Sequence, residues 1–178
     1  MSRILDYLKG RQPAMVDTLA RWVNQDSPTF SKPAVDTMGQ MIVEAFVEAG
    51  GCLTATHPQP ELGDHYTITY GQGERQILVL CHFDTVWPLG EAERRPFTIA
   101  DGRATGPGVH DMKSGTLMAL FALEALHRLG LKPRHKLIYV LTSDEEIGSL
   151  TSRALIEAEG RKSSYCLVLE GSLGGPLT

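Results

Sequence analysis

The sequence predicts an α/β fold, a three-layer α/β/α sandwich with a mixed, mostly parallel sheet. In the second half of the chain, strand-like apolar runs alternate with runs of helical period, an order typical of parallel strands lying between two layers of helices. These strand-like runs are apolar throughout, as strands buried on both faces are. With 178 residues and 42% hydrophobic content, the chain can bury one substantial core.

Two helices are expected first. Apolar residues recur at helical spacing in residues 4–25 and again in residues 33–51, where Pro33 stands near the start and Gly50-Gly51 is a stop signal. Short β-like runs follow, at residues 52–57, 65–70 and 75–84. The turn-rich GQGE between the last two runs predicts that they form a hairpin.

The remaining elements alternate in type: a strong helix, a buried strand, a second helix and another buried strand, in residues 112–130, 135–143, 149–160 and 163–172. The stretch before them, residues 88–110, has little periodicity and much Gly, Pro and charge. It predicts a long loop of the kind usually kept for function. We expect Trp87, just before this region, to pack the loop, and His110 at its end to be a loop histidine near a substrate.

Charge and composition exclude several classes of partner. The formal net charge is −4, the pI is about 5.8, and no run of Lys or Arg is longer than a pair, so nothing suggests binding to nucleic acid or to an anionic membrane. The chain has neither a signal-peptide pattern at its start nor the roughly 18 consecutive apolar residues of a membrane span. Small soluble partners and a cytoplasmic location are expected.

Cysteine and histidine spacing gives no further motif. Cys52, Cys81 and Cys166 lack CxxC spacing and are interpreted as reduced, buried thiols. Four histidines are interpreted as ordinary surface or capping groups: His57, His65, His127 and His135.

Polar side chains gather where the predicted strands end. In parallel sheets, ligands bind at the carboxyl ends of the strands. The runs CHFDTV, TSDEEIGS and LEGS lie at three such ends, and a further acidic residue opens the long helix after a glycine-rich loop. The side chains concerned are His82, Asp84, Asp111, Glu145, Glu146 and Glu170. An imidazole with several carboxylates is a ligand set suited to zinc or another first-row divalent ion.

Each of these residues also has a simpler interpretation. The SDEE run fits a helix capping box, and Asp111 could be an N-cap. His82 alone could be a hydrogen-bonded core histidine, and Glu170 alone could be solvated. Together, however, these alternatives leave like charges at a partly buried edge of the sheet, and a bound cation explains that arrangement at lower cost.

Four motifs in order carry a family resemblance: HFDTV, GPGVHDMKSG, TSDEEIGS and LVLEGS, within residues 77–172. They resemble the zinc-dependent metallopeptidase family of glutamate carboxypeptidases, aminoacylases, acetylornithine deacetylases and succinyl-diaminopimelate desuccinylases, and the bacterial glutamate carboxypeptidase branch above all. Residues 24–50 are also similar to the N-terminal helices of that family. The resemblance therefore covers nearly the whole chain.

The resemblance implies a role for each residue in a centre with two divalent ions, zinc first, with cobalt or manganese as alternatives. Asp111 corresponds to the carboxylate that bridges the two ions. His82 and Glu170 correspond to ligands of one ion, and Glu146 corresponds to a ligand of the other.

Two further residues correspond to groups that act beside the ions. Asp84 corresponds to the carboxylate that accepts the imidazole N–H and fixes its tautomer. Glu145 corresponds to the general base that takes a proton from a metal-bound water and passes it to the leaving amine.

The resemblance also implies the reaction: cleavage of an amide bond next to a free carboxylate, in a small peptide or an N-acyl amino acid, by an enzyme that is a homodimer when full length. Family members are considerably longer than this chain. Residues 1–178 are therefore expected to be the N-terminal portion of the catalytic domain, without the lid and dimerisation domain and without the final catalytic segment, and to be inactive alone. Two alternatives stay open: a deacetylase or desuccinylase of the same family, and a non-catalytic metal-binding fragment.

Overall fold

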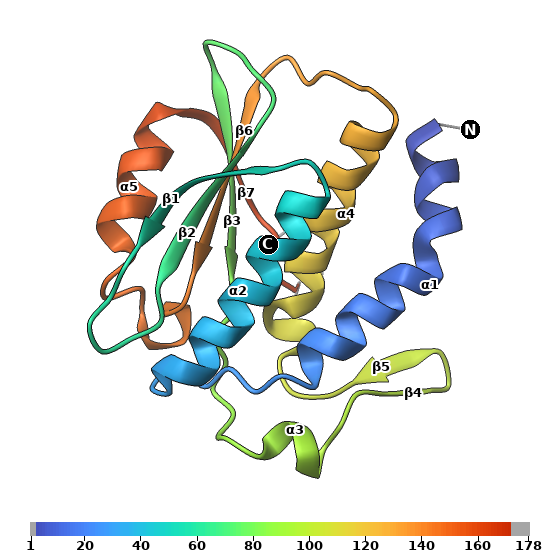
Figure 1. Ribbon diagram of the computed structural model, residues 1–178, viewed down its shortest axis with the longest axis vertical. Helices are drawn as coiled ribbons and strands as arrows, with labels where there is room; N and C mark the ends of the chain where they lie inside the picture. Colours follow the sequence, from blue (N-terminus) through green and yellow to red (C-terminus); the bar gives the residue numbers. More distant parts are fainter. Residues whose placement is uncertain (1–2, 172–178) are drawn as a thin grey trace.

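In the computed structural model, which describes residues 3–171, five strands form one sheet in the order β1-β2-β6-β3-β7 (Figure 1). In chain order they are Cys52–His57 (β1), His65–Tyr70 (β2), Gln76–His82 (β3), Lys136–Thr142 (β6) and Ser163–Val168 (β7). β3 runs parallel to both β6 and β7, whereas the β1–β2 and β2–β6 pairs are antiparallel. The sheet is mixed, and its three neighbouring strands β6, β3 and β7 are parallel.

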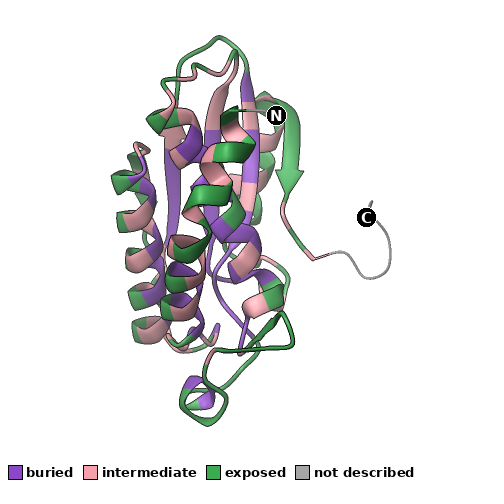
Figure 2. Ribbon diagram, turned by 90° about the vertical axis from the view of Figure 1, so that its right-hand side faces the viewer, coloured by how far each residue is buried: buried purple, intermediate pink, exposed green. Residues whose placement is uncertain are grey.

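Helices cover both faces of this sheet, which confirms the predicted three layers (Figures 1 and 2). One face carries α1 (Arg3–Val23), α2 (Lys32–Glu48) and α4 (Ser114–Arg128), and the other carries α5 (Arg153–Lys162). Among the helices of residues 3–171, none combines the length and the apolar composition needed to cross a membrane.

Two hydrophobic cores join the layers. In the larger core, between the sheet and the first three helices, the ring of Phe46 meets that of Tyr139 edge-on with centroids 5.1 Å apart. The smaller core lies under α5, and its members are Leu78, Ile138 and Val140, packed against Leu155 and Ile156. Because β3 and β6 are covered on both faces, their sequences are apolar at nearly every position.

The predicted hairpin between residues 65–70 and 75–84 is wrong. β6 lies between these two strands: Tyr139 pairs with Ile68 of β2 on one side and with Val79 of β3 on the other. The hairpin partner of β2 is β1 instead. The GQGE turn reverses the chain, but a turn signal cannot show whether a third strand inserts between the two that it connects.

The last strand is exposed, although its sequence predicts a buried one. Tyr165 is 64% exposed and Leu167 is 47% exposed, because β7 is the edge strand of the described sheet (Figure 2). The interpretation of the cysteines as buried thiols is likewise correct only for Cys81, whereas Cys52 and Cys166 are exposed. Both exposed thiols lie on the two edge strands, β1 and β7.

The segment predicted as a long loop contains short elements: a helical turn, Glu91–Arg94 (α3), and a ribbon of two strands, Thr98–Ala100 (β4) and Arg103–Thr105 (β5). Asp26 anchors the start of α3, since its carboxylate accepts the main-chain N–H groups of Gly90 at 2.6 Å and Ala92 at 2.9 Å. The segment is therefore attached to the chain that follows α1.

Candidate metal centre

The residues that follow the parallel strands lie at one end of the sheet. β3 ends at His82, which pairs in register with Thr142 at the end of β6, and β7 pairs with β3 up to Val168. The residues that come after β6 and β7, Glu145 and Glu170 among them, therefore emerge beside His82. Residues that are far apart in the sequence, each just after or at the end of a strand, therefore form one cluster in space.

The buried imidazole of His82 meets three carboxylates. Its side chain is 1% exposed, and its Nε2 lies 3.0 Å from Asp111 Oδ1, 3.3 Å from Glu170 Oε1 and 3.6 Å from Glu145 Oε2. One ring nitrogen cannot donate to three acceptors that approach from separate segments of the chain. The arrangement suits a cation that several oxygens and this nitrogen can contact together.

Asp84 occupies the other side of the ring. His82 Nδ1 lies 3.1 Å from the main-chain oxygen of Asp84 and 3.3 Å from its carboxylate Oδ1. Both of these atoms are acceptors, so Nδ1 carries the hydrogen in the neutral ring and the lone pair of Nε2 points at the carboxylates. A metal ligand needs this tautomer.

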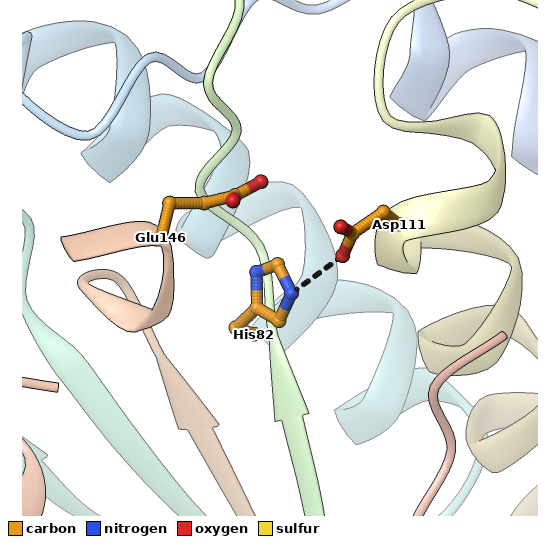
Figure 3. Close-up of side chains that lie close together, drawn as sticks. All are labelled: His82, Asp111 and Glu146. Carbon is orange, nitrogen blue, oxygen red and sulfur yellow. Dashed lines mark hydrogen bonds and ion pairs between the residues drawn. The ribbon is translucent and has the colours of Figure 1, made fainter. Parts of the chain in front are cut away.

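Glu146 approaches the same space from the turn after β6. Figure 3 shows its carboxylate and that of Asp111 facing each other above His82, and one ligand atom from each of these three residues lies within 4.8 Å of the other two. Asp111 therefore belongs to two possible ligand groups, one with His82 and Glu170 and one that includes Glu146. That geometry fits a carboxylate shared between two ions.

Negative charge accumulates at this end of the sheet. Burial disfavours a charged His82, but hydrogen bonds and charge attraction from Asp84 and Glu170 outweigh it and raise the His82 pKa to about 11. Burial, with the repulsion from Asp111, raises the pKa of Glu146 to about 7. Burial also raises the pKa of Glu145. Without a metal ion the cluster holds protons, and a divalent cation would take their place.

The capping interpretations do not describe the residues of the cluster, whereas His82 is buried and hydrogen-bonded as its simpler interpretation expects. The turn Glu145–Ile147 (η2) has no side-chain capping bond, and the hydroxyl of Ser143 donates to the carbonyl of Gly63 instead. Asp111 lies in the irregular turn Val109–Lys113 (η1) before α4, and neither this turn nor α4 has a side-chain N-cap bond. The carboxylates are not engaged as caps, so they are free to face the cluster.

From the sequence, Asp84 is assigned to the imidazole of His82, but the other contacts that hold the cluster in place are missed. The buried Asp84 accepts hydrogen bonds from the hydroxyl of Thr29 at 2.8 Å and from the main-chain N–H groups of Glu145 and Glu146 at 3.2 and 3.3 Å. The neighbouring Asp144 accepts the main-chain N–H of Thr151 at 2.6 Å. The strand-end position of Asp84 indicated its role beside His82, but no sequence signal indicated its contact with Thr29.

The interpretation of His65 as a surface or capping group is wrong. His65 is 1% exposed, its Nε2 lies 2.9 Å from the hydroxyl of Thr151, and its Nδ1 accepts the main-chain N–H of Ser143 at 3.2 Å. It joins β2 to residues on both sides of the turn Glu145–Ile147 (η2). An isolated histidine in a strand gives no sequence signal for this contact.

Lys113 is buried two residues beyond Asp111. Its side chain is 1% exposed, and its ammonium donates to the carbonyl oxygens of Trp22 at 2.9 Å and Gln25 at 2.8 Å. It therefore attaches the turn that carries Asp111 to the end of α1. Its charge is directed at main-chain carbonyls and not at the carboxylate cluster.

An α/β/α sandwich with an imidazole and several carboxylates at the ends of its parallel strands defines a protein of the metallohydrolase class. Residues 78–176 match the profile of Peptidase family M20/M25/M40. The chain belongs to this family of metal-dependent peptidases and amidohydrolases.

Similarity to individual proteins is consistent with this family assignment. The chain is 29% identical over 166 residues to Carboxypeptidase G2 of Pseudomonas sp. (strain RS-16), covering 92% of this chain and 40% of that protein. It is 30% identical over 139 residues to Succinyl-diaminopimelate desuccinylase 2 of Shewanella loihica, covering 74% of this chain and 36% of that protein. Among solved structures, human carnosine dipeptidase 1 has the same fold, with a TM-score of 0.79 at 19% identity over 93% of this chain and 40% of that chain. The chain spans at most 40% of the length of these three proteins.

Proposed function

We propose that the complete protein containing this chain is a zinc-dependent hydrolase with two metal ions. It cleaves an amide bond next to a free carboxylate, in a small peptide or an N-acyl amino acid, in the manner of a carboxypeptidase. The observation that carries the proposal is the single imidazole of His82, whose Nε2 lies within 3.6 Å of carboxylates from three separate segments of the chain. The similarity to Carboxypeptidase G2 supports the substrate class.

The residues present fit divalent ions. His82, Asp111 and Glu170 would hold one ion, and Asp111 with Glu146 would contribute to the second. Bound ions would supply Lewis-acid polarisation of the scissile carbonyl and a lower pKa for the attacking water. Zinc is proposed first because imidazole with carboxylates is a common zinc ligand set, and cobalt or manganese are the alternatives.

Glu145 is the proposed general base. Its side chain is half exposed, and its Oε2 lies 3.6 Å from His82 Nε2, so it reaches both the cluster and the solvent. A carboxylate here can take a proton from the attacking water and deliver it to the leaving amine. Burial raises its pKa, which makes it a stronger base than a fully solvated glutamate.

The chain alone is proposed to be the N-terminal portion of the catalytic domain and to lack activity. If His82 belongs to the first ion, the second ion has Asp111 and Glu146 as its ligands among residues 3–171, and three protein ligands are usual for catalytic zinc. The isolated chain would then bind one divalent ion with useful affinity. A non-catalytic metal-binding fragment is one of the alternatives that the sequence leaves open. We propose this role for the isolated chain and not for the complete protein.

A second candidate has direct support from one relative. Succinyl-diaminopimelate desuccinylase 2 is 30% identical to the chain, so the complete protein could be a deacylase of the same family, a desuccinylase or a deacetylase. The metal centre and Glu145 would have the same roles in that reaction. The two candidates differ in the acyl group removed.

The test uses the complete protein, stripped of metal with a chelator and then titrated with zinc, cobalt or manganese. We expect two ions per chain and metal-dependent hydrolysis of N-acylglutamates or dipeptides, measured by amine release. A panel containing succinyl-diaminopimelate and acetylornithine separates the two candidates. Metal-independent hydrolysis, or none on any member of the panel, would contradict the proposal.

A cytoplasmic location and a homodimer of the complete protein are further proposals. The absence of long basic runs and of a membrane-crossing helix in residues 3–171 is compatible with both. Cell fractionation tests the first, and light scattering of the complete protein tests the second.

A further inference from the structure

A histidine from the neighbouring strand holds the chain that leads into the turn Glu145–Ile147 (η2). β2 runs antiparallel to β6, and Tyr66 pairs with Leu141, so the start of β2 lies beside the end of β6. His65 is the first residue of β2 and is 1% exposed. Its Nδ1 accepts the main-chain N–H of Ser143 at 3.2 Å. The strand pairing therefore places a buried imidazole against the main chain just before the turn.

The other nitrogen of the same ring reaches the far side of the turn. His65 Nε2 lies 2.9 Å from the hydroxyl of Thr151, and this hydroxyl donates to Asp144 Oδ2 at 2.9 Å. The same carboxylate oxygen accepts the main-chain N–H of Thr151 at 2.6 Å. One imidazole is thus bonded to both ends of the segment 143–151, which contains the two glutamates of the candidate metal centre.

These hydrogen bonds determine which ring nitrogen carries the hydrogen. With the hydrogen on Nε2, Nδ1 accepts from Ser143, Nε2 donates to the hydroxyl of Thr151, and that hydroxyl donates to Asp144. With the hydrogen on Nδ1, the N–H of Ser143 would face another donor. Burial lowers the pKa of His65, against the attraction of Asp144, and so favours the neutral ring. The neutral ring with its hydrogen on Nε2 satisfies all of these contacts together.

We propose that His65 is a positioning residue, which holds both ends of the segment 143–151 and so places its two glutamates at the metal centre. The inference rests on the proposed function, in which Glu145 is the base and Glu146 is a ligand of the second ion. His65 acts through the main chain of the segment and not by contact with the reacting atoms. A histidine that only filled the core would affect the stability of the protein and not the place of these two carboxylates.

The kinetic test removes the contacts of His65 in the zinc-loaded complete protein. His65→Leu loses both contacts, and we expect it to lower kcat about tenfold with KM little changed, because a displaced base affects the reaction more than substrate binding. His65→Asn keeps an acceptor at the position of Nδ1 for the N–H of Ser143, and it should recover most of the lost kcat. A His65→Asn variant as slow as His65→Leu, or a His65→Leu variant as fast as wild type, would overturn the proposal.

Two threonines give a matched pair of variants. The hydroxyl of Thr151 is bonded to His65 Nε2, and the hydroxyl of Thr67 lies 3.0 Å from the Nε2 of His57, which is not part of the segment 143–151. Valine has nearly the volume of threonine and lacks the hydroxyl. Thr151→Val should lower kcat about threefold, the effect of one hydrogen bond, whereas Thr67→Val should leave kcat unchanged. Equal effects in the two variants would show that the loss reports general destabilisation and not the place of the turn.

Calorimetric zinc titration separates failure of the positioning role from failure of the proposed function. The first zinc site is formed by His82, Asp111 and Glu170, which lie outside the segment 143–151. His65→Leu should therefore weaken the second site, which contains Glu146, about tenfold and leave the first site unchanged. If the complete protein hydrolyses no acyl amino acid, the proposed function is wrong, while selective loss of one zinc site would still support the positioning role. Equal weakening of both sites, or of neither, would overturn that role even in an active enzyme.

Discussion

The buried carboxylate of Asp84 accepts a hydrogen bond from the main-chain N–H of Glu145 at 3.2 Å. Its other oxygen accepts the hydroxyl of Thr29 at 2.8 Å and the N–H of Glu146 at 3.3 Å. Asp84 also lies against the imidazole of His82. One carboxylate thus joins the end of β3 to the turn after β6, and it sets the spacing between the proposed histidine ligand and the proposed base.

We expect Asp84→Asn to weaken zinc binding about 10–100-fold in the complete protein. Both oxygens of Asp84 accept main-chain N–H groups, so in either orientation an Asn amide points its own N–H at another donor. Calorimetric titration with zinc measures the effect. Asp17→Asn, on the exposed face of α1, is the matched control, and equal affinities in the two variants would contradict the role of Asp84.

Substitutions of the two adjacent glutamates should have different effects on catalysis and on metal binding. Glu145→Gln in the complete protein should lower kcat by roughly 10²-fold or more, the effect of losing a general base, with metal content intact. Glu146→Gln should lose one ion as well as activity. Elemental analysis beside the kinetics checks both variants. An equal loss of metal in the two would show that the proposed division of roles is wrong.

Two groups of the metal-free chain make it lose stability as the pH rises. Glu146 has a folded pKa of about 7 against an ordinary 4.5, and His82 about 11 against 6.5, so at these two sites the folded chain binds more protons than the unfolded chain. Both contributions are complete below the ordinary pKa and decline towards the folded one. Burial lowers the pKa of Lys113 from 10.5 to about 7, so this lysine contributes in the opposite direction above pH 7. Urea unfolding in a chelator at pH 7 and 9 therefore tests His82 by comparing variants with wild type. His82→Asn should shift the change in the free energy of unfolding between pH 7 and 9 towards a rise, whereas His127→Asn, on an exposed residue, should not.

Lys113→Met should destabilise the chain by about 1–3 kcal/mol, because it removes the buried ammonium that donates to the carbonyls of Trp22 and Gln25. Methionine fills a similar volume, so the loss reports the hydrogen bonds more than the packing. Urea unfolding of the chain measures it, with the exposed Lys132→Met as the control. A Lys113→Met variant as stable as wild type would show that these two contacts contribute nothing.

The isolated chain should self-associate along β7. This edge strand exposes Tyr165, Leu167 and Val168, and unpaired strand edges with apolar side chains are sites of association. Size-exclusion chromatography with light scattering should show species larger than a monomer, and Leu167→Lys should shift them towards the monomer. A wild-type chain that is monomeric at high concentration would contradict this.

The layer structure and the clustering of the acidic residues could both be predicted from the sequence. Apolar runs at 75–84 and 135–143 indicated strands buried on both faces, and their shared direction placed His82 and Glu145 at one edge. This inference works because the period of a buried strand is a local property, and because parallel strands end on the same side.

Long-range pairing could not be predicted in the same way. The hairpin prediction for residues 65–84 failed because strand insertion depends on which partner buries more surface, a property of the whole sheet. The burial of His65 depends on contacts with Ser143 and Thr151, which lie far along the chain. The exposure of β7 likewise depends on what lies beside it and not on its own composition.

The central place of β6 has a consequence for how the chain is made. β6 is the only partner that joins β2 to β3 in the described sheet, yet it begins at Lys136, more than fifty residues after β3 ends at His82. During synthesis, β3 leaves the ribosome with no strand to pair with and must wait for β6, while the β1–β2 hairpin can already form. Contacts this distant in sequence slow folding and prolong exposure of apolar strands. Nascent chains that end before residue 136 should therefore be the ones that chaperones bind most strongly.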